Sequence, residues 1–397
     1  MRWEQQCVST HRSSLPGTWF FPRGVLRPAR RLSHFPACDT IREFTDHILC
    51  LHRTLALTIE LTDPIELALA RIPWNAARTM IRLVIDTDPG VDDAVAIMAA
   101  FAHPEARVEA ITTVAGNVSL ERTTANVCTI LDVLEQDVPV YAGCGRPLVG
   151  DAVDAAHVHG GDGLGDSRYP PSTRQVAGEH AVNALIRLAH ERPGELTLVA
   201  IGPLTNVALA TRLDPALPQR YARLVVMGGS VRGVGNVTPA AEFNVYADPE
   251  AAAVVFDAWP GLTLVSWETT MAHSFSAEQV EALLAVDSPR AEFFRHITLR
   301  SIGVLDQMLG PHPLQRAILM ARKALLEPDL LAVAAALEPD IVRQVETHHV
   351  QVELAGRHTR GHTTVDWLDR TGQEPNVNLV LEMDTERLWE LLWAAVK

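Results

Sequence analysis

From Ile81 onward, short apolar runs rich in β-branched residues alternate with longer stretches of helical composition. The predicted strands are 83–85, 108–114, 196–201, 224–226 and 262–265, and the predicted helices are 94–102, 120–134, 181–189 and 251–256. Strands that alternate with helices are typical of a mainly parallel sheet with helices on both faces. The pattern therefore predicts one Rossmann-like α/β domain over residues 80–397, with an active site at the carboxyl edge of the strands.

Residues 1–79 lack this alternation and have a different composition, with ten arginines, no lysine and seven acidic residues. An Arg-rich, acid-poor leader is typical of a transit peptide. The simpler interpretation is that Met80 is the true start and that the preceding stretch is mis-called upstream sequence. Under either interpretation we expect this N-terminal extension to be poorly ordered or untranslated, and to have no catalytic role.

The composition argues against several classes of function. A formal net charge of −14 and an isoelectric point near 5.6 argue against a nucleic-acid polymer as partner, because phosphate binding needs a basic surface. Only two of the 34 basic residues are lysines, which leaves little room for a lysine-dependent mechanism. The five cysteines form no CxxC pair, and no apolar run approaches the ~18 residues of a membrane span. We therefore expect a cytoplasmic protein with no membrane partner.

The most concentrated group of carboxylate side chains lies at residues 86–93, Asp-Thr-Asp-Pro-Gly-Val-Asp-Asp. The pattern predicts that a buried strand ends at Asp86, that the chain turns at Pro89-Gly90, and that an apolar helix begins near Asp92. Four carboxylates this close raise one another's pKa unless a cation neutralises them. Helix capping would explain one or two of them, but not four. A hard cation with oxygen ligands, calcium or magnesium, is the physical explanation.

Further polar residues follow the ends of other predicted strands. Asn117 follows the strand at 108–114, and Thr205 and Asn206 follow the strand at 196–201. Because the carboxyl ends of parallel strands meet at one edge of a sheet, we expect these loops to converge on the aspartates. Each of these loop sequences alone is also typical of an ordinary turn. The prediction of a site rests on their shared position after the carboxyl ends of strands.

Together these motifs resemble the inosine–uridine-type nucleoside hydrolases. The resemblance covers residues 81–397, in the order and spacing of that family. It rests on the Asp-rich turn and on the segments Ala115-Gly116-Asn117, His159-Gly160, Gly202-Pro203-Leu204-Thr205-Asn206, Val226-Met227-Gly228-Gly229 and 236–244, and on closing segments that contain Glu353, Arg360 and Asp366.

The resemblance implies hydrolysis of the N-glycosidic bond of ribonucleosides, or of a related N-riboside, in purine or pyrimidine salvage. It implies one calcium ion per chain, with a water molecule on that ion as nucleophile and Asp88 as general base. The implied metal ligands are Asp88, Asp93, the backbone carbonyl of Thr205, and Asp329. The implied substrate-binding residues are Asp92, Asn117, His159, Met227, Asn236, Glu242 and Asn244. Relatives are usually dimers or tetramers, so the resemblance also implies a homo-oligomer whose other partner is a small nucleoside.

One segment departs from the family pattern. Family members often carry His-Asp-Pro at this point, where the histidine protonates the leaving base, whereas this chain has Glu-Pro-Asp-Leu at 327–330. Asp329 is retained, but Pro328 stands in the place of the histidine and cannot transfer a proton. The leaving-group acid and the base preference therefore stay open, and the candidate acids are His159, His273 and His312.

Two other functions are alternatives to nucleoside hydrolysis. Asp86 and Asp88 after a strand resemble the aspartyl nucleophile motif of haloacid-dehalogenase-type phosphatases, but Gly90 stands where that family has Thr or Val, and lysines are nearly absent. A second alternative is a non-catalytic ribose- or metal-binding relic of the nucleoside hydrolase fold. Release of free ribose, release of phosphate, or binding without turnover would distinguish the three.

Overall fold

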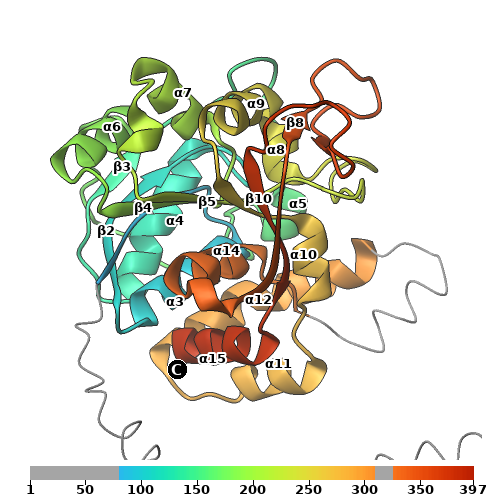
Figure 1. Ribbon diagram of the computed structural model, residues 1–397. Helices are drawn as coiled ribbons and strands as arrows, with labels where there is room; N and C mark the ends of the chain where they lie inside the picture. The colour runs from blue at the N-terminus through green and yellow to red at the C-terminus, as the bar shows by residue number, and fades with distance from the viewer. Residues whose placement is uncertain (1–79, 309–324) are drawn as a thin grey trace, which may run out of the picture. The chain divides into compact units, whose positions relative to one another are not determined.

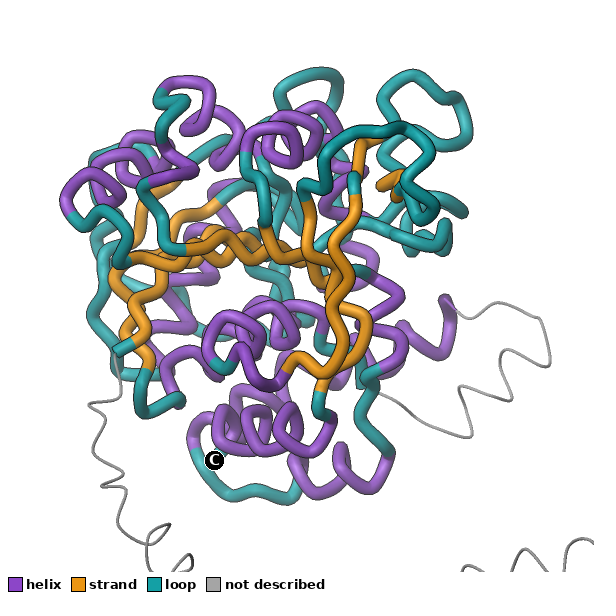
Figure 2. Tube along the Cα trace, viewed as in Figure 1, coloured by secondary structure: helices purple, strands orange, loops and turns teal. Residues whose placement is uncertain are grey.

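An eight-stranded, mostly parallel sheet forms the centre of the described chain (Figure 1 and Figure 2). The structure is a computed structural model and describes residues 80–308 and 325–397. In spatial order the strands are β3 (Val140–Ala142), β2 (Ala106–Thr113), β1 (Ile81–Thr87), β4 (Leu196–Ala200), β5 (Arg223–Met227), β6 (Leu262–Val265), β10 (Val377–Met383) and β7 (Val342–His348). Neighbouring strands are parallel except β10 and β7, which are antiparallel. The prediction of a mainly parallel α/β sheet is confirmed.

Helices cover both faces of this sheet. In the view of Figure 1, α6 (Ala181–Glu191), α7 (Thr205–Leu213) and α9 (Pro249–Ala258) lie above the sheet, where they share one apolar core. The other core contains α3 (Val91–Ala102), α4 (Leu120–Val133), α14 (Pro328–Leu337) and α15 (Thr385–Val396). The remaining helices are α5 (Ala156–His159), α8 (Phe243–Ala247), α10 (Trp267–Ala272), α11 (Ala277–Leu284) and α12 (Pro289–Met308), and a small second sheet pairs β8 (Val350–Val352) with β9 (Thr363–Val365).

The predicted strands and helices agree with the observed ones to within three residues at each end. The sequence pattern missed β7, whose residues Val342–His348 are mostly polar and partly exposed because the strand lies at the edge of the sheet. An edge strand needs no apolar run, so periodicity does not reveal it. The two interpretations of the N-terminal extension, and the candidate acid His312, lie outside the described residues.

Two almost fully buried helices, α3 and α14, position the acidic residues. Every residue of α14 is buried, and nine of the twelve residues of α3 are buried. Both helices are rich in alanine, which allows close approach, and α3 packs directly against α14 and α15. Because Asp92 and Asp93 lie in the first turn of α3 and Asp329 lies in the first turn of α14, packing of the helices fixes these carboxylates in place.

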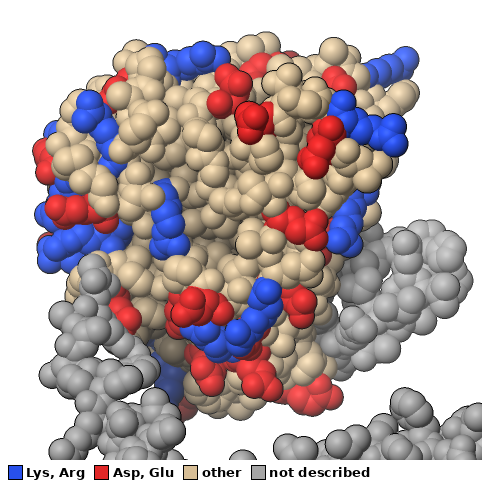
Figure 3. All heavy atoms as spheres, in the orientation of Figure 1, with Lys and Arg blue, Asp and Glu red and all other residues tan. Residues whose placement is uncertain are grey.

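The outer surface differs from this interior. On the face shown in Figure 3, acidic and basic side chains are interspersed, and neither sign forms a continuous patch. Within the described part of the chain, no helix is long and apolar enough to cross a membrane.

The packing of α14 gives a stability prediction. Leu331 is fully buried in α14, so Leu331→Ala should lower the free energy of unfolding by about 2–5 kcal/mol, measured by urea denaturation. Leu368 is 70% exposed, so Leu368→Ala should change that free energy by no more than ~0.5 kcal/mol. Equal effects of the two substitutions would contradict the burial of α14.

Candidate functional site

The carboxyl edge of the central strands collects the predicted site residues. Asp88 follows β1, Asn117 follows β2, and Met227 ends β5. Thr205 and Asp329 lie in the first turns of α7 and α14, which begin at the same edge. The geometry places these side chains where open α/β sheets bind ligands.

The Asp-rich turn is locked by Asp93. Its Oδ1 accepts hydrogen bonds from the Thr87 hydroxyl (2.5 Å) and the Asp88 backbone N–H (3.3 Å). Its Oδ2 accepts from the Gly90 backbone N–H (2.8 Å) and the Asn117 side-chain amide (3.1 Å). Four donors use most of the lone pairs that a carboxylate offers, so Asp93 holds the turn in shape and ties it to the loop after β2.

Asp88 differs from Asp93, because one of its carboxylate oxygens has no hydrogen-bond partner. Its Oδ2 accepts from the Asn117 backbone N–H at 2.7 Å, whereas its Oδ1 is buried and has no hydrogen-bond partner. Two glycines make room for this carboxylate. A Cβ atom on Gly116 would lie 2.0 Å from Oδ2, and one on Gly202 would lie 2.5 Å from Oδ1. The chain therefore keeps a carboxylate oxygen free inside a narrow slot.

Three carboxylates from two helices form the tightest acidic group. Asp92, Asp93 and Asp329 each place one oxygen within 4.8 Å of the others. Burial raises the pKa of Asp92 and of Asp93 to about 6, and burial together with the neighbouring aspartates raises the pKa of Asp329 well above its usual value. Burial and the charge of Asp93 likewise raise the pKa of Asp88.

No basic residue offsets this charge within the described chain. Among the ion pairs of residues 80–298 and 325–397, none joins these aspartates to Arg or Lys, and Nδ1 of His159, which lies 3.6 Å from Oδ1 of Asp92, offsets the charge only when the ring is protonated. Buried oxygens without partners remain on Asp88, Asp92 and Glu327. Oxygen-only donors and uncompensated negative charge fit a hard divalent cation.

The side chain of Thr205 fixes this residue at the carboxyl edge of the sheet through a hydrogen bond to Asp248. Its hydroxyl donates to Oδ2 of Asp248 (2.6 Å), which also accepts from the Leu148 backbone N–H (2.8 Å). The tight carboxylate group is Asp92, Asp93 and Asp329, whereas sequence reasoning expected Asp88 and the backbone carbonyl of Thr205 as ligands beside Asp93 and Asp329. Their assignment as ligands stays a prediction.

Glu242 and Asn244 are buried beside Met227 at the end of β5. Glu242 caps α8, because its Oε1 accepts from the Asn244 N–H (2.8 Å) and its Oε2 accepts from the N–H groups of Gly229 (2.7 Å) and Val245 (3.2 Å). The Asn244 amide donates to the Ile201 carbonyl at 3.0 Å. Both side chains therefore connect the loop after β5 to the sheet.

Asn236 lies in the loop between β5 and α8. Its Oδ1 is buried and has no hydrogen-bond partner in the protein. The loop itself is held by Glu268, whose carboxylate accepts from the backbone N–H groups of Val231 (2.9 Å) and Arg232 (2.8 Å). Sequence reasoning did not single out Glu268, since a glutamate in the first turn of a helix is an ordinary helix-start signal.

His159 lies over the Asp-rich turn. Its Nδ1 accepts from the Val91 backbone N–H (3.2 Å) and lies 3.6 Å from Oδ1 of Asp92. In the neutral ring this bond assigns the proton to Nε2. Burial lowers the pKa of His159 to about 4, against the opposing charge of Asp93. The histidine therefore lies beside the Asp-rich turn, and its role as a substrate-facing residue stays a prediction.

His273 is not available as a proton donor, contrary to one sequence-based expectation. It is buried, its Nδ1 bonds the Thr269 carbonyl (2.7 Å), and its Nε2 accepts from the Met383 backbone N–H (2.9 Å). The Nδ1 bond thus fixes the ring at the end of α10, and the Nε2 bond ties that end to β10. The sequence around His273 gives no sign of this structural role, because its partner Met383 is 110 positions away in the chain.

Two buried polar residues next to the site were not predicted to take part in it. Asn206 donates to Oδ1 of Asp86 (2.8 Å) and to the Thr113 carbonyl (2.9 Å), which ties α7 to β1 and β2. Glu327 precedes Pro328, the first residue of α14, and is only 1% exposed. An acidic residue just before an N-terminal proline looks like a plain helix start, so the sequence alone did not mark it.

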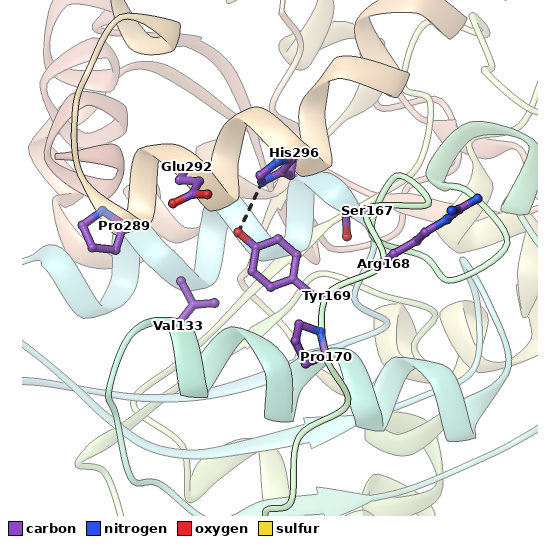
Figure 4. A pocket seen from close by; sticks show the side chains of 8 residues that line it. All are labelled: Val133, Ser167, Arg168, Tyr169, Pro170, Pro289, Glu292 and His296. Atoms are coloured by element: carbon purple, nitrogen blue, oxygen red, sulfur yellow. Dashed lines mark hydrogen bonds between the residues drawn. The ribbon is translucent and has the colours of Figure 1, made fainter.

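A separate cavity of about 390 Å³ lies outside this group (Figure 4). It is formed by the loop that contains Tyr169, by α12 and by Val133 of α4, and the Tyr169 hydroxyl lies 3.5 Å from Nδ1 of His296. None of its lining residues belongs to the carboxylate edge. The chemistry described above, and not the size of a cavity, identifies the site.

The fold defines the class of protein. A solved structure titled "Inosine-Guanosine Nucleoside Hydrolase (IG-NH)" matches with a TM-score of 0.71 and 34% identity over 80% of this chain and 99% of that chain. A purine-preferring ribonucleoside hydrolase from Gardnerella vaginalis matches with a TM-score of 0.71 and 28% identity over 79% of this chain and 98% of that chain. The architecture is that of a nucleoside hydrolase.

The chain belongs to the inosine-uridine preferring nucleoside hydrolase family, whose model matches residues 83–390. The pyrimidine-specific ribonucleoside hydrolase RihA of Enterobacter sp. (strain 638) is 35% identical over 311 residues, which is 78% of this chain and 96% of RihA. The protein is therefore a ribonucleoside hydrolase, an enzyme that cleaves N-glycosidic bonds, and the resemblance seen in the sequence is confirmed.

The slot around Asp88 gives a prediction about cation binding. Gly116→Ala would drive a methyl group into the Asp88 carboxylate and should weaken the affinity for Ca²⁺ or Mg²⁺ by ~10–100-fold, measured by isothermal titration calorimetry. Gly178→Ala is the matched control, since a Cβ atom there has no neighbour within 4 Å. Unchanged affinity in the Gly116→Ala protein would exclude Asp88 from the cation site.

Proposed function

We propose that this ribonucleoside hydrolase works with one calcium ion per chain, held by Asp88, Asp93, Asp329 and the backbone carbonyl of Thr205. The observation that carries the proposal is a set of buried carboxylates with unpartnered oxygens and no Arg or Lys pairing within the described residues. Calcium accepts six to eight oxygen ligands in flexible geometry, which suits this mixed set better than the strict octahedron of magnesium.

When bound, calcium supplies a Lewis acid that lowers the pKa of a water ligand. The remaining chemistry belongs to the side chains. Asp88 accepts the proton of the attacking water through Oδ1, the oxygen that has no partner in the protein. The C1′–N bond breaks as positive charge develops on the ribose ring, and the surrounding carboxylates stabilise that charge.

We assign the ribose hydroxyls to Asp92, Asn117, Asn236, Glu242 and Asn244. The open acceptor oxygens of Asp92 and Asn236 support this, because a hydroxyl donor would satisfy each of them. Oε1 of Glu242 accepts only one bond, so it keeps capacity for a second. In addition, Met227 and His159 line the pocket on the sugar and base sides.

A ribose site of this kind should recognise the 2′-hydroxyl. The purified protein should release reducing sugar from ribonucleosides, and kcat/KM on the matching 2′-deoxynucleosides should be lower by at least about a hundredfold, because buried polar groups are then left unpaired. A chelator should abolish both reactions. Binding without ribose release would instead favour the non-catalytic relic, and phosphate release from esters would favour the phosphatase alternative.

We also propose that residues 80–397 form the complete catalytic unit, as a homodimer or homotetramer. In support, the RihA match spans 96% of that relative yet only 78% of this chain. A protein that begins at Met80 should therefore equal the full chain in melting temperature and kcat/KM. Loss of solubility or activity on removal of residues 1–79 would show that the extension packs on the domain. Light scattering measures the oligomeric state.

The base preference is not settled by the relatives, whose names describe pyrimidine-specific, inosine-guanosine and purine-preferring enzymes. Pro328 is the first residue of α14 and offers no proton to a leaving base. General acid catalysis contributes a factor of ~10²–10⁴, so an enzyme without the usual acid should depend strongly on leaving-group quality.

We therefore expect p-nitrophenyl riboside, whose leaving group needs no proton, to be cleaved much faster than inosine or uridine. If His159 supplies the proton, His159→Ala should slow both nucleosides and spare the nitrophenyl substrate, and Pro328→His should narrow the gap between the two substrate types. Equal losses on all three substrates would mean that His159 shapes the pocket and is not the acid.

A further inference from the structure

Glu268 holds the loop between β5 and α8 with both of its carboxylate oxygens. Its Oε2 accepts a hydrogen bond from the backbone N–H of Val231 at 2.9 Å. Its Oε1 accepts from the backbone N–H groups of Arg232 (2.8 Å) and Val234 (3.3 Å). Gly233 has a φ of 76°, and such a left-handed residue lets the N–H groups around it converge on one anionic oxygen. Hydrogen bonds to a charged acceptor are stronger than neutral ones, so Glu268 fixes the path of this part of the loop.

The helix that carries Glu268 is itself fixed to the central sheet. Glu268 lies in the first turn of α10, between Trp267 and Thr269. The Thr269 hydroxyl donates to the Val380 carbonyl of β10 at 2.5 Å, and the Trp267 backbone N–H donates to the Gly229 carbonyl at 3.0 Å. The carboxylate of Glu268 therefore connects the loop to a rigid part of the fold.

Asn236 follows directly on the part of the loop that is held in this way. The backbone on either side of Asn236 is also bonded: the Gly235 N–H donates to the Pro239 carbonyl (3.2 Å), and the Val237 N–H donates to the Ala241 carbonyl (3.3 Å). The side-chain Oδ1 of Asn236 is buried and has no hydrogen-bond partner in the protein. The loop therefore fixes the backbone of Asn236 and leaves its amide oxygen able to accept a hydrogen bond from a substrate.

We propose that Glu268 is a positioning residue of the ribose site, which sets the place of Asn236 and, through it, the recognition of one ribose hydroxyl. The inference rests on the proposed function, which assigns Asn236 to the ribose, and it adds a residue that acts through Asn236. An amide in place of the Glu268 carboxylate would turn one acceptor into a donor that faces a backbone N–H. The loop would then shift, and a displacement of about 1 Å at a substrate-binding group can lower the rate ~10²-fold.

The first test compares Glu268→Gln with a matched control in the full-length, calcium-loaded protein. Glu278 is exposed, and it has the same position in α11 that Glu268 has in α10, the second residue after an N-cap serine. On the ribonucleoside that the wild-type protein cleaves fastest, Glu268→Gln should lower kcat/KM by about 10–100-fold. Glu278→Gln should leave kcat/KM within about twofold of the wild-type value.

The outcomes of this test separate the inference from the proposed function. A folded Glu268→Gln protein with the activity of the control would overturn the inference, while ribose release by the wild-type protein would leave the proposed function intact. No ribose release by the wild-type protein from any ribonucleoside would refute both. Should Glu268→Gln fail to fold, Glu268→Asp takes its place, because it keeps the charge but is one methylene group too short to reach the loop.

A double-mutant cycle distinguishes positioning of Asn236 from a general loosening of the structure. In a protein that already carries Asn236→Ala, Glu268→Gln should lower kcat/KM by less than about threefold, because the residue that it positions is gone. Among the 2′-, 3′- and 5′-deoxynucleosides, Asn236→Ala and Glu268→Gln should lose discrimination against the same one. A full loss of activity on top of Asn236→Ala, or an equal loss on all the deoxy forms, would overturn the inference.

Hydrogen exchange of the wild-type protein needs no variant. The backbone N–H groups of Val231, Arg232 and Val234 should exchange at least about tenfold more slowly than in an unstructured peptide of the same sequence, because Glu268 accepts from all three. Exchange at the rate of the unstructured peptide would show that Glu268 does not hold the loop in solution, and would overturn the inference.

Discussion

Carboxylates that are buried together without basic partners repel one another, and that cost falls only when positive charge is brought to them. Most features at the carboxyl edge of the sheet reduce this repulsion between carboxylates. The turn at residues 86–93 is held by backbone and amide donors, and α3, α7 and α14 all begin here, so their positive ends point to the same place. These partial charges reduce the repulsion, and the unpartnered oxygens show that they do not remove it.

The polar residues of the edge divide into two groups by the state of their hydrogen bonds. Asp93 and Asn206 have most of their bonding capacity used by the protein, and they fix the relative positions of β1, the loop after β2, and α7. Asp88, Asp92 and Glu327 each keep an open oxygen. The first group builds the frame and the second faces the ligands, while Asp93 does both, because its carboxylate also belongs to the acidic group with Asp92 and Asp329. Stability and activity should therefore respond differently to substitutions only a few residues apart.

The sequence predicted the parallel sheet and the Asp-rich turn because both depend on local patterns: apolar runs of strand length, and carboxylates grouped between a strand and a helix. Long-range partnership could not be predicted in this way. His273 looked like a possible proton donor until the structure showed it bonded to Thr269 and Met383, and the latter lies 110 positions away. Glu327 was not singled out because burial without a partner is a property of the folded environment, not of the residue or its neighbours in sequence.

The place of β10 in the sheet has a consequence for how the protein is made. This strand is the last in the chain, yet it lies between β6 and β7 and joins the only antiparallel edge of the described sheet to the rest. During synthesis on the ribosome, β6 emerges long before β10, whereas β7 emerges shortly before the strand that pairs with both of them. A nascent chain must therefore carry unpaired strand edges until residues 377–383 appear, so completion of this half of the sheet waits for that segment.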